Sequence, residues 1–309
     1  MSHKIVVLDG IYANPGDLSW DPLHDFGDVT IYDRTTEDEV ITRSKEASIL
    51  IINKIKLGTS EFDQLPNLKL IIISATGMDN VDLKAAESRG IKVKNVSGYS
   101  TQSVAQHVFS LILAIYNKVI PHNDSVKNGD WDQNKGFSYL LETIPELTDK
   151  TLTIIGFGQI GSEVAKIGSA FGMKVLVVSD HSKSLDKYEL VSLEEGFSEA
   201  DIISLHWPLT PEKKGIVNAS LLNLMKPTGI LVNTARGGLI KEDDLAHALR
   251  NNKPSFAALD VLTQEPPTTN HPLFQLSNCI ITPHIAWASS RSRKILLDKV
   301  FEHVAHFTN

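Results

Sequence analysis

Short runs of β-branched and other apolar residues alternate along this 309-residue chain with segments of helical character. Such alternation is typical of parallel sheets whose strands are joined by helices that cover the sheet faces. Four runs precede residue 100 and six follow residue 150: KIVVLD, VTIYD, SILIIN and LKLIIIS, then TLTIIGFG, KVLVVSD, DIISLH, GILVNT, FAALDV and CIITPH. The sequence therefore predicts an α/β fold with a parallel sheet in each half.

Four segments between or after these runs predict particular structures. Residues 36–47 begin with a threonine N-cap and early acidic residues, as a helix start should. Residues 100–119 form a helix too apolar to face water on most sides, so we expect it to be buried at a domain or subunit interface. Residues 128–150 predict an irregular connection, and residues 289–307 predict an amphipathic helix.

Composition and charge exclude several classes of protein. The formal net charge of −7 argues against non-specific binding to nucleic acids or anionic membranes, which depends on clustered Lys and Arg. The single cysteine, Cys279, cannot form an internal disulfide. No apolar stretch approaches the ~20 residues of a membrane span, and the N-terminal residues show no secretory signal. We therefore expect a soluble cytoplasmic protein that binds no nucleic acid, membrane or metal.

Three glycines, Gly156, Gly158 and Gly161, follow the first strand of the second half and open a predicted helix. In this spacing the first glycine permits a tight turn, the second lets a pyrophosphate approach the backbone, and the third allows close packing of helix on strand. Free N–H groups and the helix dipole can then hold phosphates. The motif alone is weak, because a structural turn could have the same spacing. Its context, six strands in a row, is that of a dinucleotide-binding sheet.

An acidic residue, Asp180, ends the next predicted strand, about 20 residues after the glycines. A carboxylate at this place accepts the ribose hydroxyls of a dinucleotide. The alternative is a capping or solvated aspartate. Because a carboxylate repels a 2′-phosphate, the sequence predicts NAD rather than NADP as the cofactor. The next residue, His181, could instead help to tolerate a phosphate.

Three residues capable of chemistry follow successive strands of the second half: Arg236 in NTARGGLI, Glu265 in DVLTQEPP and His284 in TPHIAWAS. Taken singly, each has an ordinary alternative as a surface ion pair, a solvated loop residue or a hydrogen-bonded loop residue. In α/β sheets, however, ligands bind at the carboxyl ends of the strands. Histidine exchanges a proton near neutrality, and a neighbouring carboxylate favours the imidazolium form and fixes its orientation, as Glu265 could do for His284. Arginine binds a carboxylate and polarises a carbonyl oxygen. Together they predict the reduction of a 2-oxo acid.

A second contact for the substrate carboxylate is expected in ISATGMDNVD, where a loop follows a strand. The N–H groups of Thr76, Gly77 and Met78 could form an anion-binding nest. The alternative is a plain turn with Asp82 as the N-cap of the next helix, and this segment alone does not decide between them.

Taken together, these residues resemble the D-isomer-specific 2-hydroxyacid dehydrogenase family. The resemblance runs in order through nearly the whole chain: ATGMDNVD, GYSTQSVAQHV, GFGQIG, HWPLT, NTARGGLI, LDVLTQEPP and TPHIAWAS. It implies two Rossmann-like parallel-sheet domains. One is a discontinuous, flavodoxin-like substrate domain of residues 1–99 and 287–309, and the other is an inserted NAD-binding Rossmann domain of residues 100–286. It also implies homodimers in which the helix after GYST contributes to the interface.

The resemblance also implies roles for individual residues. The catalytic set would be Arg236, Glu265 and His284, with Arg236 and His284 also binding the substrate. Cofactor contacts, besides the three glycines and Asp180, would be Val104, Gln159, Ile160, Pro208, Thr234, Ala235 and Asp260. Three residues depart from the family pattern: Gln159 stands where arginine is frequent, Gln106 stands where many members have glutamate, and Lys213 replaces a common threonine.

The segments VVLDGIYANPGDLSWDPL and PHIAWAS are most similar to glycerate dehydrogenases, also called hydroxypyruvate reductases. The resemblance therefore implies an NAD-dependent oxidoreductase that interconverts D-glycerate and hydroxypyruvate. Two alternatives stay open. One is the same enzyme fold acting on phosphite, formate or another 2-oxo acid. The other is a non-enzymatic, NAD-sensing module similar to a corepressor, which would lack a catalytic residue or carry an added protein-binding segment.

Overall fold

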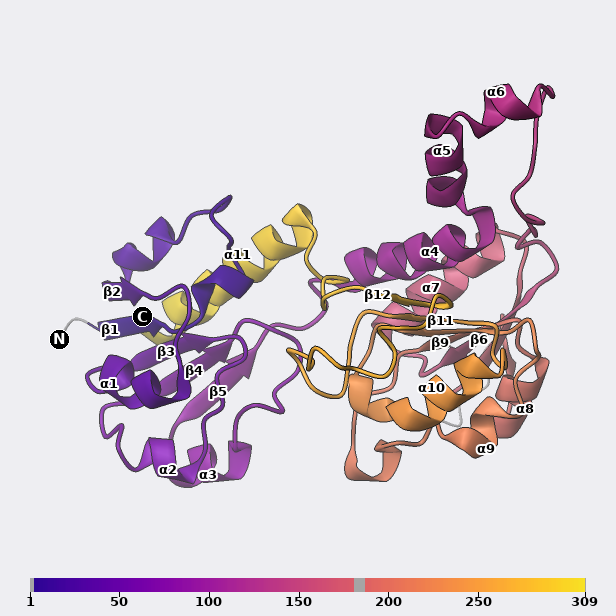
Figure 1. Ribbon diagram of the computed structural model, residues 1–309. Coiled ribbons are helices and arrows are strands. Elements are labelled where there is room, and N and C mark those ends of the chain that lie inside the picture. Colours follow the sequence, from indigo (N-terminus) through magenta and orange to yellow (C-terminus); the bar gives the residue numbers. More distant parts are fainter. Residues whose placement is uncertain (1–2, 181–186, 309) are drawn as a thin grey trace. The chain divides into compact units, whose positions relative to one another are not determined.

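The computed structural model describes residues 3–180 and 187–308, and the chain divides into two compact units. Unit 1 comprises Met1–Ser100 and Trp287–Asn309, and unit 2 comprises Thr101–Ala286. Each unit is built on one sheet of parallel strands flanked by helices (Figure 1). The predicted α/β fold with two Rossmann-like parallel sheets is therefore confirmed.

Unit 1 holds a five-stranded sheet in the order β2-β1-β3-β4-β5, which is the flavodoxin-like order. Its strands are β1 His3–Val7, β2 Gly27–Ile31, β3 Ile49–Ile52, β4 Leu70–Ile73 and β5 Lys92–Asn95, and its helices are α1 Val40–Ser44, α2 Thr59–Phe62, α3 Leu83–Ser88 and α11 Ser290–Thr308. The sequence analysis missed β5, because this edge strand exposes Lys92 and Lys94 and has no apolar run. The expected threonine N-cap is present: Thr36 forms a capping box with Glu39 and caps the 3-10 helix Glu37–Glu39, which leads directly into α1.

Successive side chains of the five strands point to opposite faces of the sheet and fill two cores. Val6 and Leu50 belong to the core that α2 and α3 cover. Their neighbours Ile5 and Ile49 belong to the core on the other face, where α11 packs. The buried residues of α11 in that core are Leu296, Leu297, Val300 and Val304. The helix predicted for residues 289–307 is thus amphipathic, and its apolar side covers the sheet of unit 1.

Unit 2 holds a seven-stranded sheet in the order β12-β11-β10-β9-β6-β7-β8. Its strands are β6 Thr151–Ile155, β7 Lys174–Val178, β8 Glu189–Leu190, β9 Ile202–Leu205, β10 Ile230–Asn233, β11 Phe256–Leu259 and β12 Cys279–Ile281. Its helices are α4 Thr101–Asn117, α5 Val119–Lys127, α6 Asp130–Asn134, α7 Gln159–Ala170, α8 Leu193–Glu199, α9 Ala219–Leu222 and α10 Glu242–Arg250. The six predicted strands are all present. The seventh strand, β8, was not predicted, because this two-residue edge strand has no apolar run.

Helix α4 lies on one face of this sheet together with α7, and α8, α9 and α10 lie on the other face (Figure 1). Val108 and Ile112 of α4 are fully buried in the core that includes Val164 of α7 and Ile154 of β6. The apolar face of α4 is therefore buried in the core of its own unit. From the sequence we expected this face to be buried at a domain or subunit interface. In the described part of the chain, no single helix is both long and apolar enough to cross a membrane. Helices α4 and α5 reach that length and composition only when taken together, across a bend of 51°.

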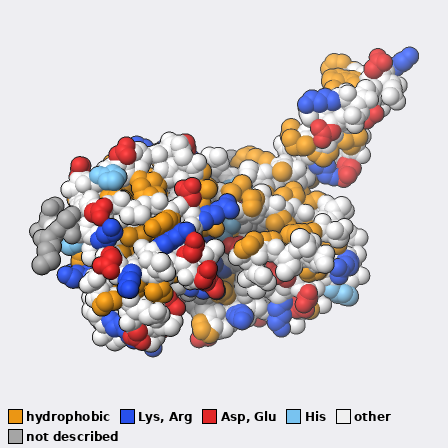
Figure 2. Space-filling view, turned by 60° about the vertical axis from the view of Figure 1, so that its left-hand side comes forward, with side chains coloured by type: hydrophobic (Ala, Val, Ile, Leu, Met, Phe, Trp, Pro, Cys, Tyr) orange, Lys and Arg blue, Asp and Glu red, His pale blue; other side chains and the backbone are white. Residues whose placement is uncertain are grey.

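Residues 119–144, which include α5 and α6, form an arm that extends away from the seven-stranded sheet (Figure 1). The sequence analysis expected most of this segment to be irregular. Lys118, with a left-handed φ of 49°, separates α4 from α5. The arm exposes many large apolar side chains, visible as hydrophobic patches on the projection in Figure 2. They are Val119, Ile120, Val126, Trp131, Phe137, Leu140, Leu141 and Ile144.

Candidate active site

Apart from Val104 on α4, the predicted site residues of unit 2 follow strands of a single parallel sheet, so they lie at one edge of it. Along that edge, the loops after β12, β11, β10, β9, β6 and β7 carry His284, Glu265, Arg236, Pro208, Gly156 and Asp180, in that order. The order of the strands along the chain reverses between β9 and β6. This is the topological switch point, outside which sheets of this kind bind their ligands.

The glycine loop uses each of its three glycines differently. Gly156 has a φ of +98°, and a Cβ there would lie 2.8 Å from the backbone of His206. A Cβ on Gly161 would lie 2.1 Å from the backbone oxygen of Gly156, so only glycine lets α7 pack this closely on the end of β6. At Gly158, in contrast, an added Cβ would meet no atom within 4 Å. The backbone is therefore open to a ligand at Gly158.

The start of α7 fits the pyrophosphate of a dinucleotide. Gly158 is the N-cap, and no side chain among the described residues caps the helix there. The N–H groups of Gln159 and Ile160 belong to the first turn, where the helix dipole favours an anion. Further along the edge, the hydroxyl of Thr234 is buried and has no hydrogen-bond partner among the described residues. A polar atom in this state needs a partner, and a bound cofactor can supply one.

Glu265 and His284 are brought together by neighbouring strands. Nδ1 of His284 lies 2.6 Å from Oε2 of Glu265, and the other carboxylate oxygen accepts the N–H of Leu262 at 3.0 Å. The side chains are 25% and 32% exposed, respectively, so the pair is partly accessible to solvent. A carboxylate on Nδ1 fixes the orientation of the ring.

Asp260 holds the turn that carries His284. Its carboxylate is 1% exposed and accepts hydrogen bonds from the N–H groups of Ile285 and Ala286 at 2.9 and 2.8 Å and from the hydroxyl of Thr282 at 2.6 Å. Its backbone oxygen accepts the N–H of His284 at 2.8 Å. Both carboxylate oxygens of Asp260 are thus engaged within the protein. Its contact with the cofactor stays a prediction.

Arg236 follows β10 in a loop that touches the loop of Glu265. The side-chain amide of Asn233, which is fully buried, donates to the backbone oxygen of Arg236 at 2.9 Å. The guanidinium donates to the backbone oxygen of Ala235 at 2.8 Å. A Cβ on Gly237 would lie 2.0 Å from the backbone of Leu262, so the loops after β10 and β11 are in direct contact.

The remaining predicted cofactor contacts lie in different environments. Asp180 is exposed beyond β7, and its carboxylate accepts a hydrogen bond from Nζ of Lys213 at 2.6 Å. Val104 is buried in the first turn of α4, whereas Pro208 is exposed after β9. His181, considered above as a residue that could tolerate a phosphate, lies outside the described residues.

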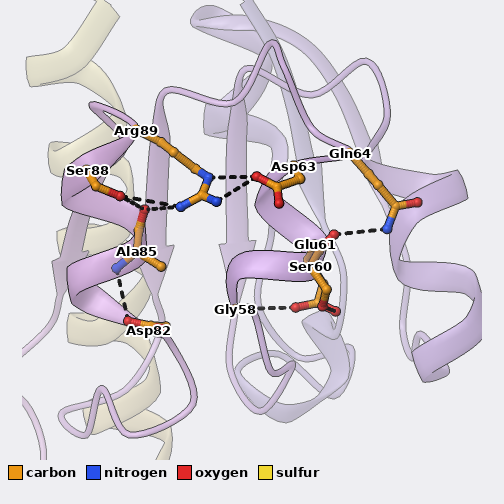
Figure 3. A network of polar contacts seen from close by, with 9 residues as sticks. All are labelled: Gly58, Ser60, Glu61, Asp63, Gln64, Asp82, Ala85, Ser88 and Arg89. Atoms are coloured by element: carbon orange, nitrogen blue, oxygen red, sulfur yellow. Dashed lines mark hydrogen bonds and ion pairs between the residues drawn. The ribbon is translucent and has the colours of Figure 1, made fainter.

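Thr76, Gly77 and Met78 follow β4 in unit 1. The backbone oxygen of Thr76 accepts the side-chain amide of Asn95 at 2.6 Å, and its hydroxyl donates to the backbone oxygen of Val96 at 3.2 Å. The alternative for this segment is confirmed in one respect: Asp82 is the N-cap of α3 and accepts the N–H of Ala85 at 3.0 Å (Figure 3). The anion-binding nest stays a prediction.

The sequence analysis missed two supporting features of the site. His206, between β9 and Pro208, hydrogen-bonds to the hydroxyl of Ser204 at 2.9 Å, and burial lowers its pKa to about 3. Glu242 accepts the N–H of Thr263 at 2.7 Å and lies 3.2 Å from Nε2 of His271, so it secures the loop that carries Glu265. No local signal identifies either feature, because each depends on contacts between separate loops.

Comparisons with known proteins agree with this geometry. Residues 109–286 match the family model described as D-isomer specific 2-hydroxyacid dehydrogenase, NAD binding domain. A hydroxypyruvate reductase of Blautia hydrogenotrophica is 41% identical, with 98% of this chain and 96% of the relative covered. A glycerate dehydrogenase of Methylorubrum extorquens is 38% identical, with 99% and 96% covered. The D-lactate dehydrogenase of Aquifex aeolicus, solved with NAD and lactic acid, superimposes with a TM-score of 0.84 at 30% identity, with 99% and 95% covered.

The chain therefore belongs to the D-isomer-specific 2-hydroxyacid dehydrogenase family. It is an NAD-dependent oxidoreductase that interconverts a D-2-hydroxy acid and a 2-oxo acid by hydride transfer. The predicted family, enzyme class and cofactor are confirmed.

Two alanine substitutions in the glycine loop should affect different properties, one the stability of the fold and the other the binding of NAD⁺. Gly161→Ala should lower the free energy of unfolding by about 1–3 kcal/mol, because its methyl group overlaps the backbone of Gly156. Gly158→Ala should change that energy by less than about 0.5 kcal/mol but weaken NAD⁺ binding at least about tenfold, since the methyl group occupies the open space above the helix start. Urea unfolding measures the free energy of unfolding, and calorimetric titration measures the affinity for NAD⁺. Normal NAD⁺ binding by a folded Gly158→Ala variant would contradict this assignment of the pyrophosphate site.

Proposed function

We propose that this enzyme reduces hydroxypyruvate to D-glycerate with NADH and catalyses the reverse oxidation with NAD⁺. The substrate assignment rests on the relatives named hydroxypyruvate reductase and glycerate dehydrogenase, which align over nearly the whole chain. The mechanism rests on one observation above all, the 2.6 Å contact between His284 and Glu265 at the carboxyl edge of the sheet. The unit made of Met1–Ser100 and Trp287–Asn309 would be the substrate domain, and Thr101–Ala286 would be the NAD-binding domain.

Different groups of residues would bind the pyrophosphate, the ribose and the nicotinamide end of the dinucleotide. The N–H groups of Gly158, Gln159 and Ile160 would hold the pyrophosphate, and the Asp180 carboxylate would accept the ribose hydroxyls. The residues after β9, β10 and β11 would line the nicotinamide end, with Val104 packing near the ring. They are Pro208, Thr234, Ala235 and Asp260. When bound, NADH supplies the hydride that C2 of the 2-oxo acid accepts.

The three catalytic residues would each act on a different part of the substrate. Arg236 would bind the carboxylate and polarise the carbonyl oxygen, because its guanidinium is planar and permanently charged. Nδ1 of His284 is bonded to Glu265, so Nε2 is the atom that would give a proton to the oxygen at C2. Glu265 would keep that imidazole oriented. The N–H groups of Thr76, Gly77 and Met78 would add a second contact to the carboxylate.

We also propose that the enzyme is a cytoplasmic homodimer. The arm of residues 119–144 exposes several large apolar side chains, with Phe137 96% and Leu140 67% exposed, and apolar patches of this kind mark association sites. A second copy of the same arm would bury these side chains. A reducing compartment suits a chain whose single cysteine, Cys279, has no partner for an internal disulfide. The thiol is partly buried, and this burial raises its pKa to about 12.

The substrate can be tested with a panel of 2-oxo acids. With NADH, kcat/KM for hydroxypyruvate should exceed that for pyruvate by about tenfold or more, and the product should be D-glycerate by chiral chromatography. His284→Ala should reduce kcat by about 10²–10⁴-fold with the same substrate. A higher kcat/KM for pyruvate or for a bulkier 2-oxo acid would overturn the substrate assignment.

The role of Glu265 can be tested by steady-state kinetics. Glu265→Gln removes the anionic acceptor that orients the imidazole of His284, so kcat of reduction should fall by about tenfold or more while KM for hydroxypyruvate changes little. Asp243→Asn, which removes an exposed carboxylate on α10, is the matched control and should leave both constants unchanged. An unchanged kcat in Glu265→Gln would show that Glu265 does not act on His284.

The oligomeric state can be tested on the arm. Replacing Phe137 and Leu140 together by aspartate should convert the dimer to a monomer in sedimentation or light-scattering experiments, because charges would enter the apolar contact. Leu224→Asp places the same charge at a leucine that is 41% exposed outside the arm, and this control should remain dimeric. A wild-type monomer, or a dimer that survives the double substitution, would refute an interface through the arm.

A further inference from the structure

Lys213 makes a defined contact at the ribose end of the cofactor site. It is the last residue of the 3-10 helix Pro211–Lys213, which follows β9, and its Nζ donates to Oδ2 of Asp180 at 2.6 Å. The side chain of Lys213 is only 17% exposed, whereas that of Asp180 is 51% exposed. The carboxylate thus remains accessible from solvent while it is bonded to a largely covered ammonium group.

A second contact keeps this ammonium group in place. Nζ of Lys213 lies 5.0 Å from the centre of the indole ring of Trp207, which is 8% exposed. A cation over an aromatic face is attracted by the ring, and the lysine stem covers apolar surface. Lys213 is therefore a positioned charge, unlike a typical surface lysine that moves freely in water.

The position of this charge relative to a bound dinucleotide follows from the sheet. Asp180 lies beyond β7, which pairs with β6, and the N–H of Gly156 donates to the backbone oxygen of Val178 at 2.8 Å. The glycine loop and the Asp180 segment are therefore neighbours at the same edge. A pyrophosphate at the start of α7 would bring the adenosine ribose to Asp180, and hence to Lys213.

We propose that Lys213 is a specificity-determining residue that lets this site accept a cofactor carrying a 2′-phosphate. The inference rests on the proposed ribose role of Asp180. An isolated carboxylate repels the 2′-phosphate dianion, but the ammonium group at 2.6 Å offsets that charge and offers a donor to the phosphate oxygens. The enzyme would then bind NADP⁺ as well as NAD⁺, with NAD⁺ preferred because Asp180 still accepts the ribose hydroxyls.

A purely structural role for Lys213 makes a different prediction. If the lysine only tethers Asp180 and Trp207, its removal should weaken the binding of NAD⁺ and of NADP⁺ to the same extent. If it offsets the repulsion between Asp180 and the 2′-phosphate, its removal should weaken the binding of NADP⁺ alone. The ratio of the two dissociation constants separates these possibilities without any measurement of activity.

The test is calorimetric titration of the intact enzyme with NAD⁺ and with NADP⁺. Lys213→Met keeps the length and packing of the side chain but removes its charge. It should lower the affinity for NADP⁺ about tenfold and change the affinity for NAD⁺ by less than about twofold. Lys213→Arg should retain NADP⁺ binding. Lys214→Met removes the charge of the exposed neighbouring lysine and should leave both affinities unchanged.

Ionic strength gives an independent readout. Raising KCl from about 50 to 200 mM should weaken the binding of NADP⁺ more than that of NAD⁺ in the wild-type enzyme. This difference in salt dependence should be smaller in Lys213→Met, because the charge that the salt screens has been removed. Equal losses for both cofactors in Lys213→Met, or no detectable NADP⁺ binding by the wild type, would overturn the proposal. Reduction of hydroxypyruvate by NADH, assayed in parallel, reports separately on the proposed function.

Discussion

All seven strands of unit 2 run in the same direction, and this parallel pairing is what gathers residues from distant parts of the chain. Each strand must be followed by a crossover, so each carboxyl end opens into a loop whose side chains are not committed to the sheet. Adjacent strands lie about 4.8 Å apart, which brings the loops of Arg236, Glu265 and His284 to neighbouring places on one edge. The glycine loop lies on the other side of the switch point, so the proposed pyrophosphate site and the proposed catalytic residues follow different strands of one sheet.

The site also depends on a residue whose side chain is almost completely buried. Asp260 is 1% exposed, and a charge in that position is tolerated only because every oxygen of its carboxylate is hydrogen-bonded. Its partners, Thr282, Ile285 and Ala286, flank His284, whose φ of +55° is a left-handed conformation that costs free energy in a residue other than glycine. The hydrogen bonds to Asp260 hold the backbone in this conformation and so help to aim the imidazole.

Apolar side chains serve two purposes in unit 2. On α4 they pack against α7 and the sheet, where Val108 and Ile112 are fully buried and stabilise the fold. Beyond Lys118 the same chain continues into the arm, where Phe137 and Leu140 are exposed and contribute nothing to the core of their own unit. Surface of this kind is costly in water, and association is the ordinary way to remove it.

The sequence by itself determined the features whose physical cause is local. Apolar runs indicated the central strands, the G-x-G-x-x-G spacing indicated a turn into a helix, and Thr36 indicated a helix start, because each signal needs only a few neighbouring residues. Only the tertiary structure decided the edge strands β5 and β8, which have no apolar run and depend on the strand beside them. The pairing of Glu265 with His284 was expected from their places after two strands of one sheet, and the structure brings them to 2.6 Å. The tertiary structure alone decided the pairing of Asp180 with Lys213. This contact joins segments that meet only after the sheet has assembled, so no pattern within either segment contains it.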